Sequence, residues 1–408
     1  MINYLKLFYY SFKDLITGQF KWFAILFMAL VYRIEFMHDT GFGAGKMLQV
    51  VTVFGLFYLL LREQINWQSL LVRGMNTPVK SITLLYVYAV ISTLWAFLPS
   101  FAFFLSFQNL IMIMLFTWAF SLFPDFRNLE KGFLFFAFTI SFLEFVLSRV
   151  QVMSLFQHLL PQGSMAAIML AYCAGEYLNE RRDSDRQVML RNAAIAFLFF
   201  LIINTSGGAN ASAVVAVGVA MFFGGKKGYA LLLLMLGLFL FLNEEYVDDI
   251  ILMLMPGKNM ETIEAGNGRD HIWEILLRYA DEKPLFGWGF ACIERVNQLG
   301  VIGGQSLSDA HSNSVGMYGS LGIVGCILFG WHLLTTGLHL FRHIAQIGGL
   351  GLFAAFTCAT VNGYSYGFLS GKTCSITITY IMVVLLSYYY DNVPLEAEED
   401  ECGSAEQF

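Results

Sequence analysis

Two short runs late in the chain, Gly268-Arg269-Asp270-His271-Ile272-Trp273 and Asp309-Ala310-His311-Ser312-Asn313-Ser314, decide how the sequence is organised. Both lie between Glu261 and Gly325, where polar residues gather in an otherwise apolar chain. The residues before and after this stretch have the pattern of helices soluble in hydrocarbon. We therefore expect water-facing chemistry to occur between Glu261 and Gly325.

The composition is that of a membrane protein. Of the 408 residues, 57% are hydrophobic and only 13% are charged, and the mean hydropathy is +0.62. A chain of this kind could not cover its surface with polar groups in water. Long apolar runs and few prolines favour membrane-spanning helices. We predict an all-α polytopic membrane protein.

About twelve transmembrane helices are expected from the apolar runs. The predicted spans are residues 21–38, 46–61, 80–97, 101–122, 131–149, 161–178, 191–205, 209–224, 228–243, 312–338, 345–362 and 373–390. They divide the chain into a membrane domain at 1–243 that begins with an interfacial segment, a long loop at 244–310, three last spans at 311–391, and a disordered acidic tail at 392–408.

Lys and Arg are more frequent in the connections that share a side with the N-terminus, so both termini are predicted to be cytoplasmic and the long loop extracytoplasmic. The net charge of -6 comes from acids clustered in a loop and the tail, which does not indicate a nucleic-acid partner. The six cysteines have no metal-ligand spacing, and no third ligand accompanies the Asp-His pairs. We expect no metal and no cofactor.

The long loop is predicted to be ordered and to contain an amphipathic helix on the outer membrane surface. Asn267 is a candidate cap, and a turn at Pro284 and Gly287-Trp288-Gly289 would end the segment. The apolar positions recur at helical spacing: Ile272, Ile275, Leu276 and Tyr279. In the next span, glycines recur every three residues between positions 316 and 325, at Gly316, Gly319, Gly322 and Gly325. These glycines favour close helix packing over contact with a ligand.

Several of these elements together resemble the signature of one family. They are Gly268-Arg269, Trp273, Pro284-Leu285-Phe286-Gly287-Trp288-Gly289, Ala310-His311-Ser312-Asn313 and Gly319-Ser320-Leu321-Gly322-Ile323-Val324-Gly325. The pattern resembles the O-antigen ligase and polymerase superfamily, which are membrane glycosyltransferases of the C-type fold (GT-C). The resemblance implies a donor glycan on undecaprenyl pyrophosphate, at the outer face of the bacterial inner membrane. Outside residues 268–325 the likeness is only one of topology.

By position, His311 matches the family's catalytic histidine, and Arg269 matches its loop arginine. A neutral imidazole could accept a proton from an acceptor hydroxyl, and a guanidinium could stabilise the leaving pyrophosphate. The sequence places His311 in the first turn of a membrane helix, capped by Ser308 or Asp309. The alternatives are a structural histidine at the interface and a surface arginine paired with an acid.

Four further residues are candidates for substrate binding. Trp273 could stack on a sugar or anchor its helix at the membrane interface. Asn313 could orient His311 or cap its helix. Arg278 could bind phosphate, face solvent or form a salt bridge, and Arg149 could bind phosphate or extend to the membrane surface.

One departure from the family pattern stands out. The family has an arginine in a Ser-Arg pair where its seventh and eighth spans meet, and that arginine is thought to help hold the pyrophosphate. The corresponding junction here, Asn204 to Ser212, contains no arginine. Either another cation substitutes, with Arg149 and Arg278 as candidates, or the donor site is modified.

The expected function is a glycosyltransferase that polymerises lipid-linked polysaccharide repeat units. The alternatives are a ligase that transfers the glycan to a lipid or other acceptor, a transporter or lipid-glycan flippase, and a catalytically silent relative. A flippase is less favoured because the two halves show no repeat and the polar residues lie in an outer loop. The expected partners are the undecaprenyl-pyrophosphate-linked donor, a glycan or lipid acceptor, the lipid bilayer and other polysaccharide-assembly membrane proteins.

Overall fold

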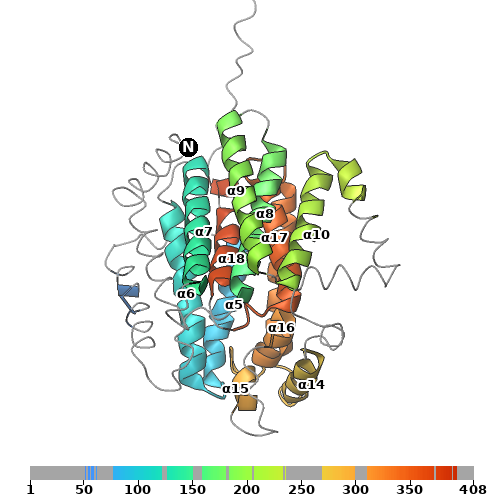
Figure 1. Ribbon diagram of the computed structural model, residues 1–408. Helices are drawn as coiled ribbons and strands as arrows, with labels where there is room; N and C mark the ends of the chain where they lie inside the picture. The colour runs from blue at the N-terminus through green and yellow to red at the C-terminus, as the bar shows by residue number, and fades with distance from the viewer. Residues whose placement is uncertain are drawn as a thin grey trace, which may run out of the picture.

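A computed structural model shows a bundle of long helices with two short ones at one end (Figure 1). It describes residues 77–121, 126–149, 159–180, 183–204, 206–232, 235, 269–298, 310–371, 374–387 and 389–392, and isolated positions between 51 and 61. The interfacial segment, the span at 21–38, most of the spans at 46–61 and 228–243, and the tail from residue 393 lie outside the described residues.

The regular structure of the described ranges is helical, and these ranges contain no strand. The helices are α5 (Thr77–Ile91), the short 3-10 helix η1 (Ser92–Leu94), α6 (Pro99–Ser121), α7 (Phe126–Arg149), α8 (Leu159–Asn179), α9 (Ser184–Asn204), α10 (Gly207–Phe223), α14 (Arg269–Ala280), α15 (Ile293–Gln298), α16 (Asn313–Arg342), α17 (Gly349–Ser365), α18 (Ser375–Leu386) and α19 (Tyr389–Asn392). The all-α prediction is confirmed for this part of the chain.

Each predicted span inside the described ranges corresponds to a helix, with differences at the ends. The span predicted at 80–97 begins earlier, at Thr77, and its α-helix ends at Ile91. The chain then passes through η1 and reaches the next helix at Pro99, whose fixed φ suits a helix start. The span predicted at 373–390 ends at Leu386.

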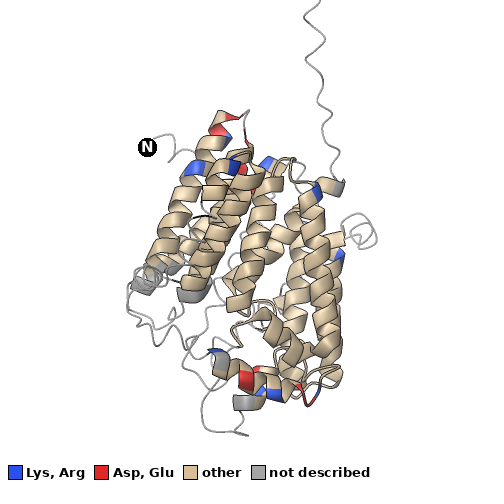
Figure 2. Cartoon of the chain, turned by 90° about the vertical axis from the view of Figure 1, so that its right-hand side faces the viewer, with Lys and Arg blue, Asp and Glu red and all other residues tan. Residues whose placement is uncertain are grey.

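The helices have the lengths and surfaces of an integral membrane protein. Among the described helices, four are long and apolar enough to cross a membrane: Thr77–Leu94, Pro99–Thr117, Ser184–Ile203 and Asn313–Arg342. Figure 2 shows that Lys, Arg, Asp and Glu gather at the two ends of the bundle, whereas the length between them is almost free of charge.

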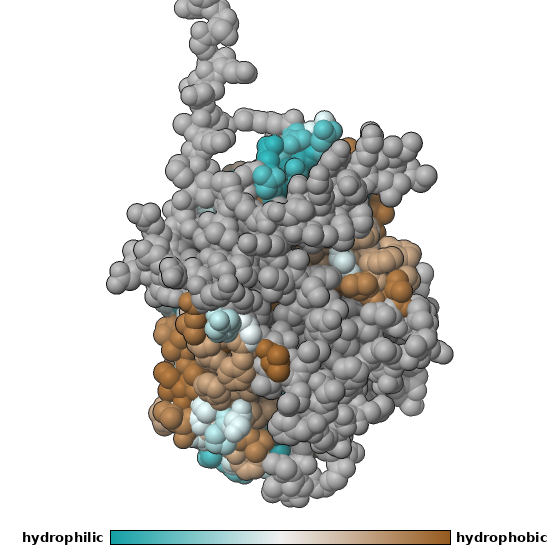
Figure 3. Space-filling view, turned by 90° about the vertical axis from the view of Figure 1, so that its left-hand side faces the viewer, coloured by the Kyte–Doolittle hydropathy of each residue, from teal (hydrophilic) through white to brown (hydrophobic). Residues whose placement is uncertain are grey.

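Large apolar side chains also cover the outside of the bundle. Ile202 of α9 is 64% exposed, and Ile327 and Trp331 of α16 are 65% and 54% exposed. Figure 3 shows one such apolar flank, with hydrophilic residues chiefly at the ends of the molecule. Because water would not tolerate so much apolar surface, these faces suit contact with lipid.

Helix α8 lies at the centre of the bundle and packs against α7, α9, α10, α17 and α18. Small residues allow this close packing. A Cβ atom built on Gly175 of α8 would lie 2.9 Å from the Cα atom of Gly351 in α17. The two backbones therefore meet directly, and this contact fixes α17 beside α8.

Candidate functional site

The amphipathic helix predicted in the long loop is present as α14. Its buried residues Leu276 and Tyr279 pack with Ile293 and Val296 of α15 and with Ala310. His271, Glu274 and Arg278 are exposed on the other side. The predicted apolar stripe is confirmed, whereas the predicted cap, Asn267, lies outside the described residues. α14 and α15 together cover the end of the bundle where α16 begins (Figure 1).

The predicted turn after α14 is also present, and it docks on α16 through its backbone. Gly287 and Gly289 have φ angles of 68° and 97°, which favour glycine. The amide of Trp288 donates to the carbonyl of Gly319 over 3.0 Å, and the amide of Gly289 donates to that of Ser320 over 2.8 Å.

Helix α16 is broken at Gly322 to receive this turn. Gly322 has φ 67° and ψ -164°, a conformation open almost only to glycine. The break frees backbone groups, and the amide of Ile323 donates to the carbonyl of Pro284 over 2.8 Å. A Cβ built on Gly322 would lie 2.4 Å from the carbonyl carbon of Leu285. The glycines therefore pack closely, as predicted, but Gly322 also interrupts the helix, which was not predicted.

His311 lies before α16 and not in its first turn, so this part of the sequence prediction is wrong. The helix begins at Asn313, and Ser312 occupies the N-cap position without a capping bond from its side chain. His311 has a positive φ of 49°, which a right-handed helix cannot accommodate. Its half-buried imidazole is therefore carried by a tight bend just outside the helix.

The bend is held through the residue before the histidine. The indole Nε1 of Trp273 donates to the carbonyl oxygen of Ala310 over 2.8 Å. The backbone N–H of Ala310 donates to Oε1 of Glu294, 2.9 Å away. The Trp273 ring meets the Tyr364 ring edge to face, with centroids 5.5 Å apart. Trp273 is thus half-buried against protein on one side, a contact that neither sugar stacking nor membrane anchoring had predicted.

Asn313 makes a contact that neither of its predicted roles includes. Its side chain is 3% exposed, and its Oδ1 accepts the backbone N–H of Leu369 over 2.8 Å. This bond joins the start of α16 to the segment that follows α17. Asn313 is therefore part of the packing between α16 and the segment after α17.

The two arginines of α14 differ in their surroundings. Arg269 is the first residue of the helix, one turn before Trp273, and is half-buried. Arg278 forms an ion pair with Glu274, and their side chains are 75% and 59% exposed. The salt-bridge alternative is therefore correct for Arg278. Arg149 is the last residue of α7, and its side chain lies outside what the structure describes.

The junction that lacks the family's arginine is the tight start of α10. This helix begins at Gly207, directly after Ser206. A Cβ built on Gly208 would lie 2.3 Å from the hydroxyl oxygen of Ser365 in α17. A side chain at position 208 would therefore require the side chain of Ser365 to move.

A family model described as O-antigen ligase matches residues 193–330, a range that contains α10, α14, α15, the bend at His311 and the break at Gly322. This match supports the resemblance of that part of the chain to the O-antigen ligase and polymerase superfamily. None of the curated proteins compared with the chain matches its sequence. The expected resemblance is therefore confirmed, and the matched region contains Arg269 and His311.

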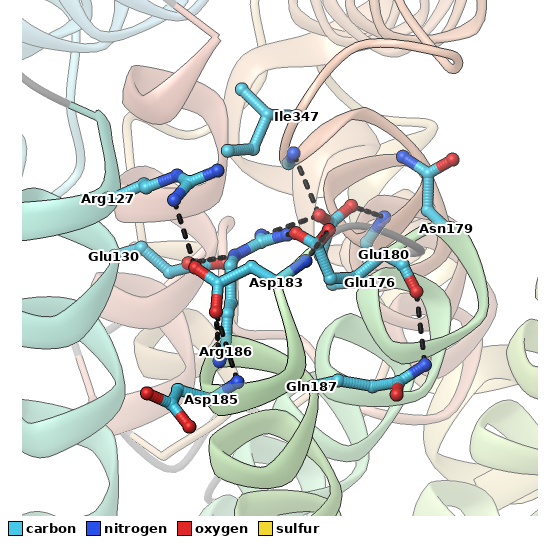
Figure 4. Close-up of polar contacts among 12 residues, drawn as sticks. Arg127, Glu130, Glu176, Asn179, Glu180, Asp183, Asp185, Arg186, Gln187 and Ile347 are labelled. Atoms are coloured by element: carbon cyan, nitrogen blue, oxygen red, sulfur yellow. Dashed lines mark hydrogen bonds and ion pairs between the residues drawn. The ribbon is translucent and has the colours of Figure 1, made fainter.

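A second polar centre, which the sequence did not predict, lies where α8 ends and α9 begins, at the end of the bundle opposite α14 (Figure 1), and Figure 4 shows its side chains. Arg186 of α9 binds Glu130 of α7 through two nitrogens, Nε at 2.8 Å and Nη2 at 2.5 Å. Its guanidinium also donates to Glu176 of α8 and to Glu180, each over 2.7 Å. The four side chains are between 0% and 9% exposed.

The carboxylate of Glu176 extends this network to the connection between α16 and α17. It accepts the backbone N–H groups of Gly348 over 2.8 Å and of Gly351 over 2.9 Å. At the rim, Arg127 pairs with Asp183 over 2.9 Å. The network therefore joins α7, α8, α9 and α17. Only the individual charged residues were visible in the sequence, because Glu130 lies 56 positions before Arg186.

Proposed function

We propose that the chain is a membrane glycosyltransferase that acts at the extracytoplasmic face on glycans linked to undecaprenyl pyrophosphate. The most favoured reaction is the polymerisation of polysaccharide repeat units. The observation that carries the proposal is the bond from Trp273 to Ala310, because it brings the helix that begins with Arg269 to the bend that carries His311. Both residues lie within the region that matches the O-antigen ligase family.

In this reaction His311 is the general base. Its neutral imidazole accepts the proton of the acceptor sugar's hydroxyl group, and the resulting oxygen nucleophile attacks the anomeric carbon of the donor glycan. The bond between that carbon and the pyrophosphate oxygen breaks, and the electron pair leaves with the lipid pyrophosphate. Arg269 stabilises the charge that develops on the leaving group.

The assay uses membranes that contain the variant and are supplied with the lipid-linked repeat unit. The His311→Ala variant should form no long polymer, because the acceptor hydroxyl has lost its base. His271→Ala is the matched control, since His271 is an exposed histidine on α14. Full polymer formation by His311→Ala would refute the proposal.

The second candidate is ligation to a lipid or other acceptor, which the description of the matching family model favours. The same membranes distinguish the two reactions when an acceptor lipid is added. A ladder of products that differ by one repeat unit indicates polymerisation. Transfer of an intact, preformed glycan to the acceptor lipid, without a ladder, indicates ligation. In both cases the product should depend on His311.

A further inference from the structure

The residue before His311 has both of its backbone polar groups bound by side chains from other helices. The N–H of Ala310 is bound by Glu294 of α15, and its carbonyl is bound by Trp273 of α14. Ala310 is fully buried, and its side chain packs in the cluster that joins α14 to α15. Ala310 is therefore fixed in position by three independent contacts.

Such fixation matters because His311 has an unfavourable backbone. A positive φ at a residue other than glycine persists only where its surroundings impose it. The helix that follows cannot impose it alone, because α16 starts two residues later and Ser312 makes no side-chain capping bond. Trp273 and Glu294 thus hold in place the peptide group directly before the strained residue His311.

Glu294 also lies close to the other wall of the bend. A Cβ built on Gly371 would lie 3.9 Å from Oε1 of Glu294, the same oxygen that accepts the Ala310 N–H. Gly371 is two residues after Leu369, whose N–H is bound by Asn313. One carboxylate therefore sits between the residue before His311 and the segment after α17.

We propose that Glu294 is a positioning residue that, together with Trp273, holds His311 in its reactive orientation. This inference rests on the proposed function of His311. Toward Ala310, Glu294 acts as a hydrogen-bond acceptor, and glutamine offers an acceptor of the same shape, so glutamine should replace it in this role. The sequence did not identify Glu294, because it lies 17 positions before His311 in a short helix without a recognisable pattern.

The main test compares Glu294→Ala with Glu294→Gln in the polymerisation assay, per amount of folded protein in detergent. Glu294→Ala should lower kcat on the order of tenfold to a hundredfold, because a small displacement of a catalytic group has effects of that size. Its KM for the lipid-linked unit should stay within roughly threefold of the wild-type value, since no substrate contact is lost. Glu294→Gln should retain most of the activity. Glu274→Ala, at an exposed acid of α14, is the control and should keep the wild-type kcat.

A second variant tests the other half of the arrangement. Trp273→Phe keeps an aromatic ring against Tyr364 but removes the N–H that binds Ala310. It should lower kcat in the same manner as Glu294→Ala. The double variant should lose less than the product of the two single losses, because both act on one residue.

The outcomes separate this inference from the proposed function. A wild-type kcat in Glu294→Ala, with an inactive His311→Ala, overturns the positioning role alone. Equal losses in Glu294→Gln and Glu294→Ala also overturn it, because charge would then be what matters. Full activity of His311→Ala overturns the proposed function itself. If Glu294→Ala does not fold, Trp273→Phe and Glu294→Gln decide: a wild-type kcat in Trp273→Phe, or loss of activity in folded Glu294→Gln, contradicts the proposal.

Discussion

Gly322 is required for two separate reasons at a single position. Its φ of 67° with ψ of -164° is a conformation that side chains disfavour, and the backbone of Leu285 occupies the space where a Cβ would lie. Gly330, eight residues later in the same helix, is exposed and has no atom near its Cβ position. The two glycines therefore offer a direct comparison within α16.

Substitution of Gly322 by alanine should destabilise the protein, while the same change at Gly330 should not. Backbone strain alone at Gly322 costs about 1–3 kcal/mol, and the collision with Leu285 adds to it. Gly330→Ala should be neutral or stabilise the helix by up to about 1 kcal/mol. Thermal unfolding in detergent measures both. A Gly322→Ala variant that melts like the wild type would show that α16 can be continuous.

The position of His311 relative to the start of α16 could not be predicted from the local sequence. The run from Ser308 to Ser314 offers several candidate caps, so the start of α16 was uncertain in the sequence by a few positions. That small uncertainty decides whether the imidazole lies on a helix or on a bend. The contacts that settle it come from Trp273 and Glu294, which belong to other helices.

At the scale of elements, the network around Arg186 joins four helices through one guanidinium and its acids. Arg186→Met would leave Glu130 and Glu176 buried without their cation. Loss of one partner from a buried ion pair costs about 3–5 kcal/mol, so we expect a large drop in unfolding free energy. Arg186→Lys should lie between, because lysine keeps the charge but not the two-nitrogen fork that binds Glu130.

The control for this prediction is Arg127→Ala. Arg127 pairs with Asp183 nearby, but its side chain is 48% exposed. Exposed pairs contribute less than about 1 kcal/mol, so this variant should melt close to the wild type. Denaturation in detergent measures both. Equal effects of Arg186→Met and Arg127→Ala would contradict a structural role for the buried network.

The helices and turns whose conformation depends on their own residues were predictable from the sequence. The stripe of α14 and the turn at Gly287 follow from local spacing and from glycine, and both are present. The break in α16 was not predictable, because it depends on a backbone partner in the segment after α14. The bond from Arg186 to Glu130 and the bond from Trp273 to Ala310 join residues distant in sequence, and for that reason no local pattern revealed them.

At the scale of the whole molecule, charged residues gather at the two ends of the bundle. The two ends hold different residues and elements. One holds Arg127 and Arg186, which lie in connections between predicted spans that share a side with the N-terminus. The other holds α14, α15 and the bend at His311 (Figure 1). The predicted orientation places this second end outside.

Cysteine labelling in whole cells tests this orientation. In a background without the natural cysteines, His271→Cys should react with a membrane-impermeant maleimide in intact cells, because His271 is exposed on α14. Asp185→Cys, exposed at the other end, should react only after the membrane is opened. The reverse pattern would place α14 in the cytoplasm and contradict the proposed function. Natural Cys292 is a poor competitor in any case, since burial raises the pKa of its thiol and suppresses the reactive thiolate at neutral pH.

The turn at Pro284–Gly289 is attached to α16 by its backbone, while some of its side chains face outward. Backbone amides and carbonyls make the hydrogen bonds described between Pro284–Gly289 and the broken helix, whereas Leu285 and Phe286 are 58% and 53% exposed. Attachment therefore places little demand on the identity of these two side chains, as long as the glycines remain. Replacement of these two side chains should therefore change what the turn presents to its surroundings, while its backbone attachment to α16 is retained.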